Sequence, residues 1–144
     1  MIFSGIHGSH LKSGALVQPD QVIGENIMRH IETAIRLRIL IGEDDRYKDG
    51  PLYEEIMFRA QSAHLSGATV FYGYMGYGKG SGGHLSPGKI LRTSKDLPTV
   101  IEILDSEAKV MPFLDVLDEL LVGGVVTMEK VQMVRYSKKA KGAQ

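Results

Sequence analysis

The sequence IRLRILIGEDDRYKDGPLYEEI, Ile35–Ile56, predicts a strand, a charged loop and a helix in one short span. Isoleucine or leucine occupies positions 35, 37, 39 and 41, whereas arginine occupies positions 36 and 38. This alternation is typical of a strand with one buried face. Pro51 suits the first position of a helix, and Glu54 and Glu55 favour the positive end of its dipole.

Further periodic segments follow in the same order. Residues 69–77 are rich in β-branched and aromatic side chains, 89–93 is a short candidate strand, and PTVIEILD at 98–105 is a clear one. A second helix is expected between 105 and 122, and a last strand at 131–136. The β-α-β-β-α-β order over 35–136 predicts an α+β, ferredoxin-like sandwich, with a four-stranded antiparallel sheet and two helices on one face.

The sequence also predicts where the two helices start and end. Gly67 is expected to end the first helix as its C-cap. Pro112 lacks an N–H group, so the second helix should either start late, near Ala108, or kink at the proline. Gly123 and Gly124 should stop that helix.

The ends of the chain differ from this central region. Residues 1–34 form an N-terminal extension in which Ile23, Ile27, Ile31 and Ile35 recur every four residues, which favours a helix over 21–33. Such an extension would be either a docking element or the product of a misassigned start codon. Residues 137–144 form a basic tail that contains three lysines.

Composition excludes several classes of protein. The 144 residues hold 17 basic and 17 acidic side chains, and a net charge of zero argues against a nucleic-acid binder. No cysteine is present, which excludes disulfides, thiolate metal sites and a cysteine nucleophile. No apolar run approaches the roughly 20 residues of a membrane span, and the start is a poor signal peptide, so we expect a cytoplasmic protein that is not membrane-inserted.

The predicted sheet is apolar on both sides. Leu40, Phe71 and Met75 fall on, or partly on, the face opposite the helices. Such a face needs a cover, and self-association into a homo-oligomer is the simplest one. The alternative is that the N-terminal segment covers it.

A glycine-rich segment is the most unusual feature of the sequence. Seven of the 17 glycines fall between Gly73 and Gly88, and glycine lets backbone N–H groups approach an anion. The pattern G-x-G-x-x-G occurs at 78–83, but Pro87 follows where a dinucleotide fold needs a helix. We expect a loop that orders on a ligand or partner, the alternative being a plain hairpin connection. Lys79, Lys89 and Arg92 would bring positive charge to its base.

The loop at 42–50 is a second candidate for ligand binding. Arg46 could hold a phosphate or carboxylate in a fork, and Tyr47 could stack on a base. The alternatives are a solvated turn, in which Asp and Arg cap one another, and a divalent cation on Glu43, Asp44 and Asp45. Elsewhere, Glu102 interrupts an apolar strand and should pair with Arg36 or Arg38, or with a ligand.

The run 37–56 resembles the opening of the "domain of unknown function 190" family of small PII-like proteins. Gly67–Val70, the glycines at 73, 76 and 78, Leu97–Ile103 and Val131–Tyr136 continue the resemblance in order over about 100 residues. The resemblance implies a ferredoxin-like fold assembled as a trimer. PII relatives bind adenine nucleotides between subunits and signal through the loop between the second and third strands. The charged loop and the glycine-rich segment with its flanking cations supply the expected ligand-binding residues, which are Glu43, Asp45, Arg46, Tyr47, Lys48, Gly76, Gly78, Lys79, Lys89 and Arg92.

The sequence therefore favours a regulatory, signal-transducing protein over an enzyme. We expect no catalytic residue, no bound metal and no cofactor other than an adenine nucleotide as ligand, with a membrane transporter or channel as a partner of the long loop. Two alternatives stay open: a metal-handling or structural trimer, and a small enzyme at the subunit interface. The enzyme would use Glu43, Asp44 or Asp45 as base and Arg46 as anion clamp.

Overall fold

The computed structural model describes residues 20–74, 76 and 97–139. The chain divides into two compact units, one made of residues 33–133 and the other of residues 1–32 and 134–144. We call the first the core unit and the second the arm, and each is described by itself. The elements are β1 (Asp20–Gly24), β2 (Ile27–Gly42), β3 (Arg46–Tyr47), β4 (Gly50–Pro51), α1 (Leu52–Ser62), β5 (Ala68–Tyr72), β6 (Pro98–Asp105), α2 (Glu107–Leu120) and β7 (Val125–Lys138).

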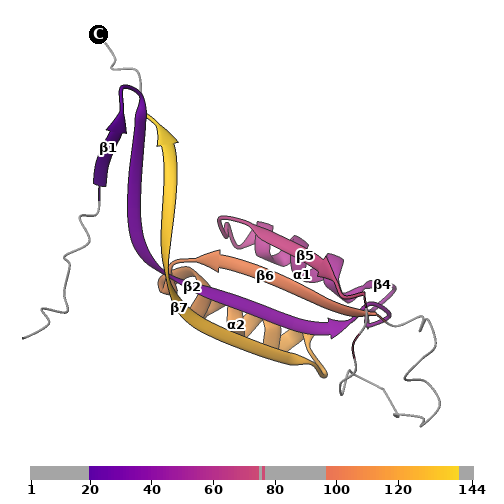
Figure 1. Ribbon diagram of the computed structural model, residues 1–144. Helices are drawn as coiled ribbons and strands as arrows, with labels where there is room; N and C mark the ends of the chain where they lie inside the picture. The colour runs from indigo at the N-terminus through magenta and orange to yellow at the C-terminus, as the bar shows by residue number, and fades with distance from the viewer. Residues whose placement is uncertain (1–19, 75, 77–96, 140–144) are drawn as a thin grey trace, which may run out of the picture. The chain divides into compact units, whose positions relative to one another are not determined.

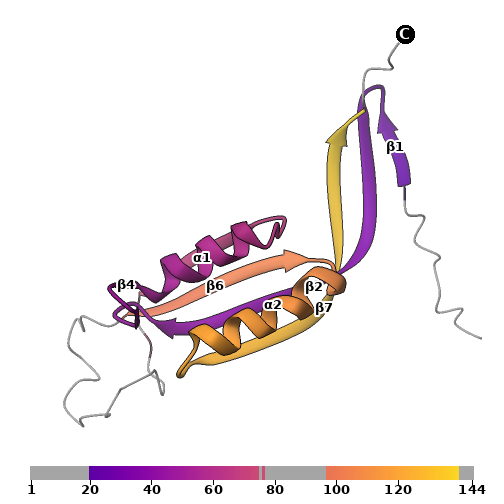
Figure 2. The ribbon, with the colours of Figure 1, turned by 180° about the vertical axis from the view of Figure 1, so that it is seen from behind.

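The core unit has the predicted α+β, ferredoxin-like architecture. Residues 35–42 of β2 pair antiparallel with β6, β5 pairs antiparallel with β6, and β7 pairs with β2. The sheet order is therefore β7–β2–β6–β5, in which the first and third of these strands in the chain lie at the centre. Figures 1 and 2 show both helices on the same face of this sheet.

Strand alternation fixes which face of the sheet is buried. In β2 the side chains at 35, 37, 39 and 41 are buried, and in β6 those at 99, 101, 103 and 105 are buried. Ile56 of α1 and Phe113 of α2 pack against them to form one apolar core. Burial of these side chains is the main source of stability of the unit.

The opposite face of the sheet mixes apolar and charged side chains. Leu40 and Phe71 are exposed there, at 40% and 51% of their surface. Arg38 Nε donates to Glu102 Oε2 at 2.7 Å, which confirms that Glu102 has an arginine partner on the neighbouring strand. Arg36 pairs instead with Glu129 of β7 at 2.5 Å. Met75, also expected on this face, lies outside the described residues.

The end of α1 corrects one expectation. The prediction that Gly67 caps the helix was wrong, because α1 ends at Ser62 and the left-handed position is occupied by His64, with a φ of 55°. The N–H of Leu65 donates to Ala60 O and that of His64 to Gln61 O, which is a Schellman motif. Leu65 then packs on the core, as such motifs favour.

Helix α2 begins at Glu107, close to the late start expected, and runs through Pro112. The proline leaves the carbonyl of Ala108 without an intrahelical N–H donor. Ala108 and Pro112 both lie on the exposed side of the helix, where water can hydrogen-bond to that carbonyl. This placement explains how the helix tolerates the residue.

The arm corrects the prediction of a helix over 21–33. β1 pairs antiparallel with the first residues of β2, with Asp20 opposite His30 and Val22 opposite Met28, and β2 is already extended from Ile27. A spacing of four residues also places side chains on one face of a strand, and a run of β-branched isoleucines favours that reading. β7 extends beyond the predicted 131–136 to Lys138, while the segment 89–93 and residues 140–144 lie outside the described residues.

Candidate functional site

The two loops singled out from the sequence meet at one end of the sheet. β2 ends at Gly42, which lies opposite Pro98 at the start of β6. The N–H of Glu43 donates to Leu97 O at 2.8 Å, and the N–H of Gly73 donates to Pro98 O at 2.6 Å. The loop 43–51 and both ends of the segment 73–97 are therefore hydrogen-bonded to the same corner of the sheet.

The loop 43–51 is an ordered turn held by its own residues. Asp45 is buried; its Oδ2 accepts from the N–H of Gly42 at 2.9 Å, and its carbonyl accepts from the N–H of Leu52 at 2.8 Å. Arg46 donates to the carbonyl of Asp49 at 2.8 Å, and Lys48 turns the β3–β4 ribbon with a φ of 51°. Asp45 and Arg46 thus shape the loop through bonds to backbone atoms, rather than by capping one another.

Aromatic side chains surround this ribbon. The ammonium of Lys48 lies 5.2 Å from the centre of the Tyr47 ring. The rings of Tyr53 in α1 and Tyr72 in β5 meet edge to face, with centroids 5.9 Å apart. The hydrogen bond with Tyr72, then burial, raises the pKa of Tyr53 to about 12, so the Tyr53 phenol stays neutral near neutral pH.

An open groove of about 460 Å³ runs between the β3–β4 ribbon and α1. Its lining residues are Tyr47, Lys48, Asp49, Gly50, Pro51, Glu54, Glu55 and Phe58. The Glu55 carboxylate forms an ion pair with Arg59, and Arg59 Nε lies 2.8 Å from Glu55 Oε1. The groove carries more acidic than basic side chains and is by itself unsuited to an anion.

The structure brings together only part of the predicted ligand set. Glu43, Asp45, Arg46, Tyr47 and Lys48 share the loop 43–51. Gly76 lies against Pro98, since a Cβ there would come within 2.8 Å of the proline Cγ. Gly78, Lys79, Lys89 and Arg92 lie outside the described residues, so their part in a site stays a prediction.

The sequence did not predict two places where glycine allows close packing near this end of the sheet. A Cβ on Gly73 would meet Pro98 Cγ at 2.5 Å, and one on Gly124 would meet the carbonyl oxygen of Leu40 at 2.7 Å. Gly124 also has a φ of +105°, which other residues rarely adopt. The Gly-Gly pair at 123–124 was a visible signal, but it indicated only the end of a helix.

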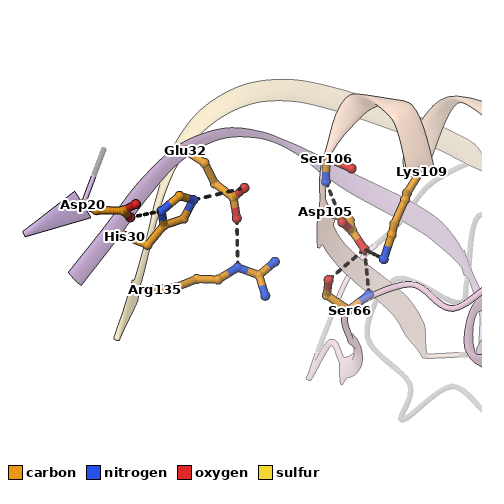
Figure 3. A network of polar contacts seen from close by, with 8 residues as sticks. All are labelled: Asp20, His30, Glu32, Ser66, Asp105, Ser106, Lys109 and Arg135. Carbon is orange, nitrogen blue, oxygen red and sulfur yellow. Dashed lines mark hydrogen bonds and ion pairs between the residues drawn. The ribbon is translucent and has the colours of Figure 1, made fainter. Parts of the chain in front are cut away.

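A separate polar cluster surrounds Asp105 at the start of α2 (Figure 3). Its carboxylate accepts from the N–H and hydroxyl of Ser66 at 2.7 and 2.9 Å and from the N–H of Ser106 at 2.7 Å. Burial opposes ionisation, but these bonds and the nearby Lys109 lower the pKa of Asp105. All these donors belong to the chain, so the cluster fixes the α1–β5 loop to α2.

The described residues were also compared with the requirements of a metal site and of a membrane span, with the following result. Within residues 20–74, 76 and 97–139, no group of three or more His, Asp or Glu side chains is placed to hold a metal ion. Over the same ranges no helix is both long and apolar enough to cross a bilayer.

Comparison with other proteins matches the core unit to one family and to members of a protein family named UPF0166. The family model DUF190, described as "Uncharacterized ACR", matches residues 34–133. A "UPF0166 protein" of Aquifex aeolicus is 35% identical over 98 residues, covering 68% of this chain and 90% of that protein. A UPF0166 protein of Methanocaldococcus jannaschii is 33% identical over 85 residues, covering 59% of this chain and 76% of the other.

A solved structure agrees on the fold. The apo form of CPII, a nitrogen regulatory PII-like protein of Thiomonas intermedia K12, is similar with a TM-score of 0.50 and 18% identity, covering 74% of this chain and 98% of that one. Another structure of CPII, bound to ADP, AMP and bicarbonate, has a TM-score of 0.48 and 20% identity, covering 72% and 90%. The fold is PII-like, and by the family match over residues 34–133 the chain belongs to the DUF190 family.

Proposed function

We propose that this protein is a PII-like regulator that forms a trimer and binds a small anionic ligand, an adenine nucleotide, in clefts between subunits. The loop 73–88 then changes its order on binding and engages a partner, for which a membrane transporter or channel on the cytoplasmic side is the best candidate. The observation that supports this most is the shared anchorage of the loop 43–51 and the segment 73–97 at Leu97 and Pro98. A ligand that contacts one loop there would bias the other.

Charge indicates which residues would hold the phosphates. The described part of the corner is acidic: Glu43, Asp44, Asp45, Asp49, Glu54 and Glu55 outnumber Arg46, Lys48 and Arg59. A nucleotide phosphate therefore needs further cations, and we assign this part to Lys79, Lys89 and Arg92, which lie in or next to the glycine-rich segment. Tyr47 would stack on the base. No step of this proposal uses a catalytic residue.

The open face of the sheet supports association between copies. Leu40 and Phe71 are exposed on it beside the Arg38–Glu102 and Arg36–Glu129 pairs. A second copy seated on this face would cover the apolar side chains.

Isothermal titration calorimetry of the full chain with AMP, ADP, ATP and cyclic AMP tests the proposal. We expect at least one nucleotide to bind below millimolar concentration. A variant with Lys79→Gln, Lys89→Gln and Arg92→Gln should lose at least ten-fold in affinity, whereas the arm variant Lys138→Gln with Lys139→Gln should not. Absence of binding by all four nucleotides at millimolar concentration would overturn the nucleotide assignment.

A further inference from the structure

Four charged side chains form a cluster that joins the three strands of the arm (Figure 3). His30 of β2 lies between two carboxylates: its Nδ1 pairs with Asp20 of β1, and its Nε2 lies 3.7 Å from Glu32 Oε2 of β2. Arg135 of β7 donates from Nε to Glu32 Oε1 at 2.9 Å. The cluster lies within the arm and outside residues 34–133, which match the family, so it is separate from the candidate site.

β1 depends on such side-chain pairs because it has little else to hold it. It is an edge strand of five residues, and none of its side chains is buried. A strand that buries no side chain gains little from the hydrophobic effect and relies on its backbone ladder and on cross-strand pairs. Those pairs are Asp20 with His30 and Gln21 with Arg29, which lie opposite each other in the β1–β2 register.

The protonation state of His30 sets the charge of the cluster. With a protonated imidazole, two cations balance the two carboxylates, whereas a neutral imidazole leaves one uncompensated negative charge. The hydrogen bond with Asp20 raises the pKa of His30 above 6.5; burial opposes this shift, and the charges of Asp20 and Glu32 add to it. The His30 side chain is 45% exposed, so one pair alone would be weak, and the effect depends on both carboxylates together.

The other charged side chains among the described residues of the arm make no ion pair with His30. Strand alternation puts Arg29 and Lys138 on the opposite face of the ribbon. Glu25 and Lys139 are at the β1–β2 turn, where the N–H of Lys139 donates to a backbone carbonyl at 2.9 Å. His30 is therefore the group whose titration near neutral pH changes this cluster.

We infer that the cluster of Asp20, His30, Glu32 and Arg135 is a pH-sensitive latch that holds β1 on β2. Protonated His30 links Asp20 of β1 to Glu32, which Arg135 of β7 holds in place. Because the folded-state pKa of His30 is raised, its contribution is fully present below pH 6.5, down to about pH 4 where carboxylates take up protons, and is lost as the pH rises through the folded-state pKa. Release of β1 uncovers the edge of β2 at residues 27–30, and an open strand edge can pair with a strand of another chain.

NMR of the isotopically labelled full chain between pH 5.5 and pH 9 tests the latch. The ring signals of His30 give its pKa, and amide hydrogen exchange in β1, corrected for the intrinsic effect of pH, gives the ratio of released to bound β1. Each unit by which β1 raises the pKa of His30 should lower that ratio about ten-fold at acidic pH. We expect protection of β1 to fall with the same midpoint as the His30 ring titration. Protection that is constant over this range, or that falls with a different midpoint, would overturn the inference.

Two variants and a matched control separate the latch from a general effect of pH. Asp20→Asn should lower the pKa of His30, and His30→Gln should give a β1 whose weaker protection no longer changes between pH 6 and pH 9. The control His64→Asn removes a histidine of the core unit from a left-handed position that asparagine tolerates, and it should keep the wild-type response. A wild-type response in His30→Gln would overturn the inference. No nucleotide is used, so this result is independent of the proposed function.

Discussion

Gly124→Ala is the substitution whose cost can be worked out most directly from the structure. Gly124 joins α2 to β7 with a φ of +105°. Its added Cβ would lie 2.7 Å from the carbonyl oxygen of Leu40 and 3.2 Å from Ile41 Cγ2. An alanine pays about 1–2 kcal/mol for the left-handed backbone, and moving the β2 backbone away adds a comparable amount. We expect the free energy of unfolding to fall by about 2–4 kcal/mol.

Urea unfolding followed by circular dichroism measures this loss, at one fixed protein concentration. Gly67→Ala is the matched control, because nothing lies within 4 Å of a Cβ at that position. The control should change stability by less than about 0.5 kcal/mol. If the two variants unfold at the same urea concentration, Gly124 does not make the close approach on which this reasoning depends.

Three further perturbations test other parts of the structure. His64→Gly should raise the free energy of unfolding by about 1 kcal/mol, because glycine adopts the left-handed C′ position without strain; urea unfolding that shows a loss instead contradicts the Schellman motif. Asp105→Asn should cost about 2 kcal/mol at neutral pH. The pKa of Asp105 is lowered from 3.8 in the folded state, so its contribution to the free energy of unfolding is present above pH 3.8 and is lost as the pH falls through the folded-state pKa. If the stability of the variant depends on pH as that of the wild type does, the cluster does not stabilise the Asp105 carboxylate. Phe71→Glu should reduce the mass measured by light scattering; an unchanged mass would show that the sheet face is not an interface.

The core could be predicted from the sequence because strict alternation of apolar and polar residues along a strand determines which of its faces is buried. PTVIEILD became β6 over the expected residues 98–105, and its inward side chains are those that the period of two selects. The arginine partner of Glu102 also followed, since a carboxylate on that strand has few cationic neighbours. Patterns of this kind depend on local periodicity and burial alone.

The arm and the helix ends could not be predicted for physical reasons. Isoleucines four residues apart suit one face of a helix and one face of a strand equally, and only pairing with β1 and β7 decides for the strand. β7 alternates poorly because few of its side chains are buried. His64 takes a position usually filled by glycine, so Gly67 was the wrong cap.

The two loops of the candidate site could be identified from the sequence, but their contact could not. The charge and aromatic content of the loop 43–51 marked it, and the glycines marked its neighbour at 73–88. Their meeting at Leu97 and Pro98 is a tertiary contact that no local pattern encodes. The structural roles of Asp45 and Arg46 inside the loop were equally hidden, since they depend on the position of Gly42 and Asp49.

Native mass spectrometry of the full chain with added AMP, ADP and ATP tests the proposed regulator, because one spectrum reports both the number of copies and the nucleotides bound. The proposed function predicts a trimer that carries up to one nucleotide per subunit. A monomer, or an assembly that takes up none of the three nucleotides at millimolar concentration, would contradict it.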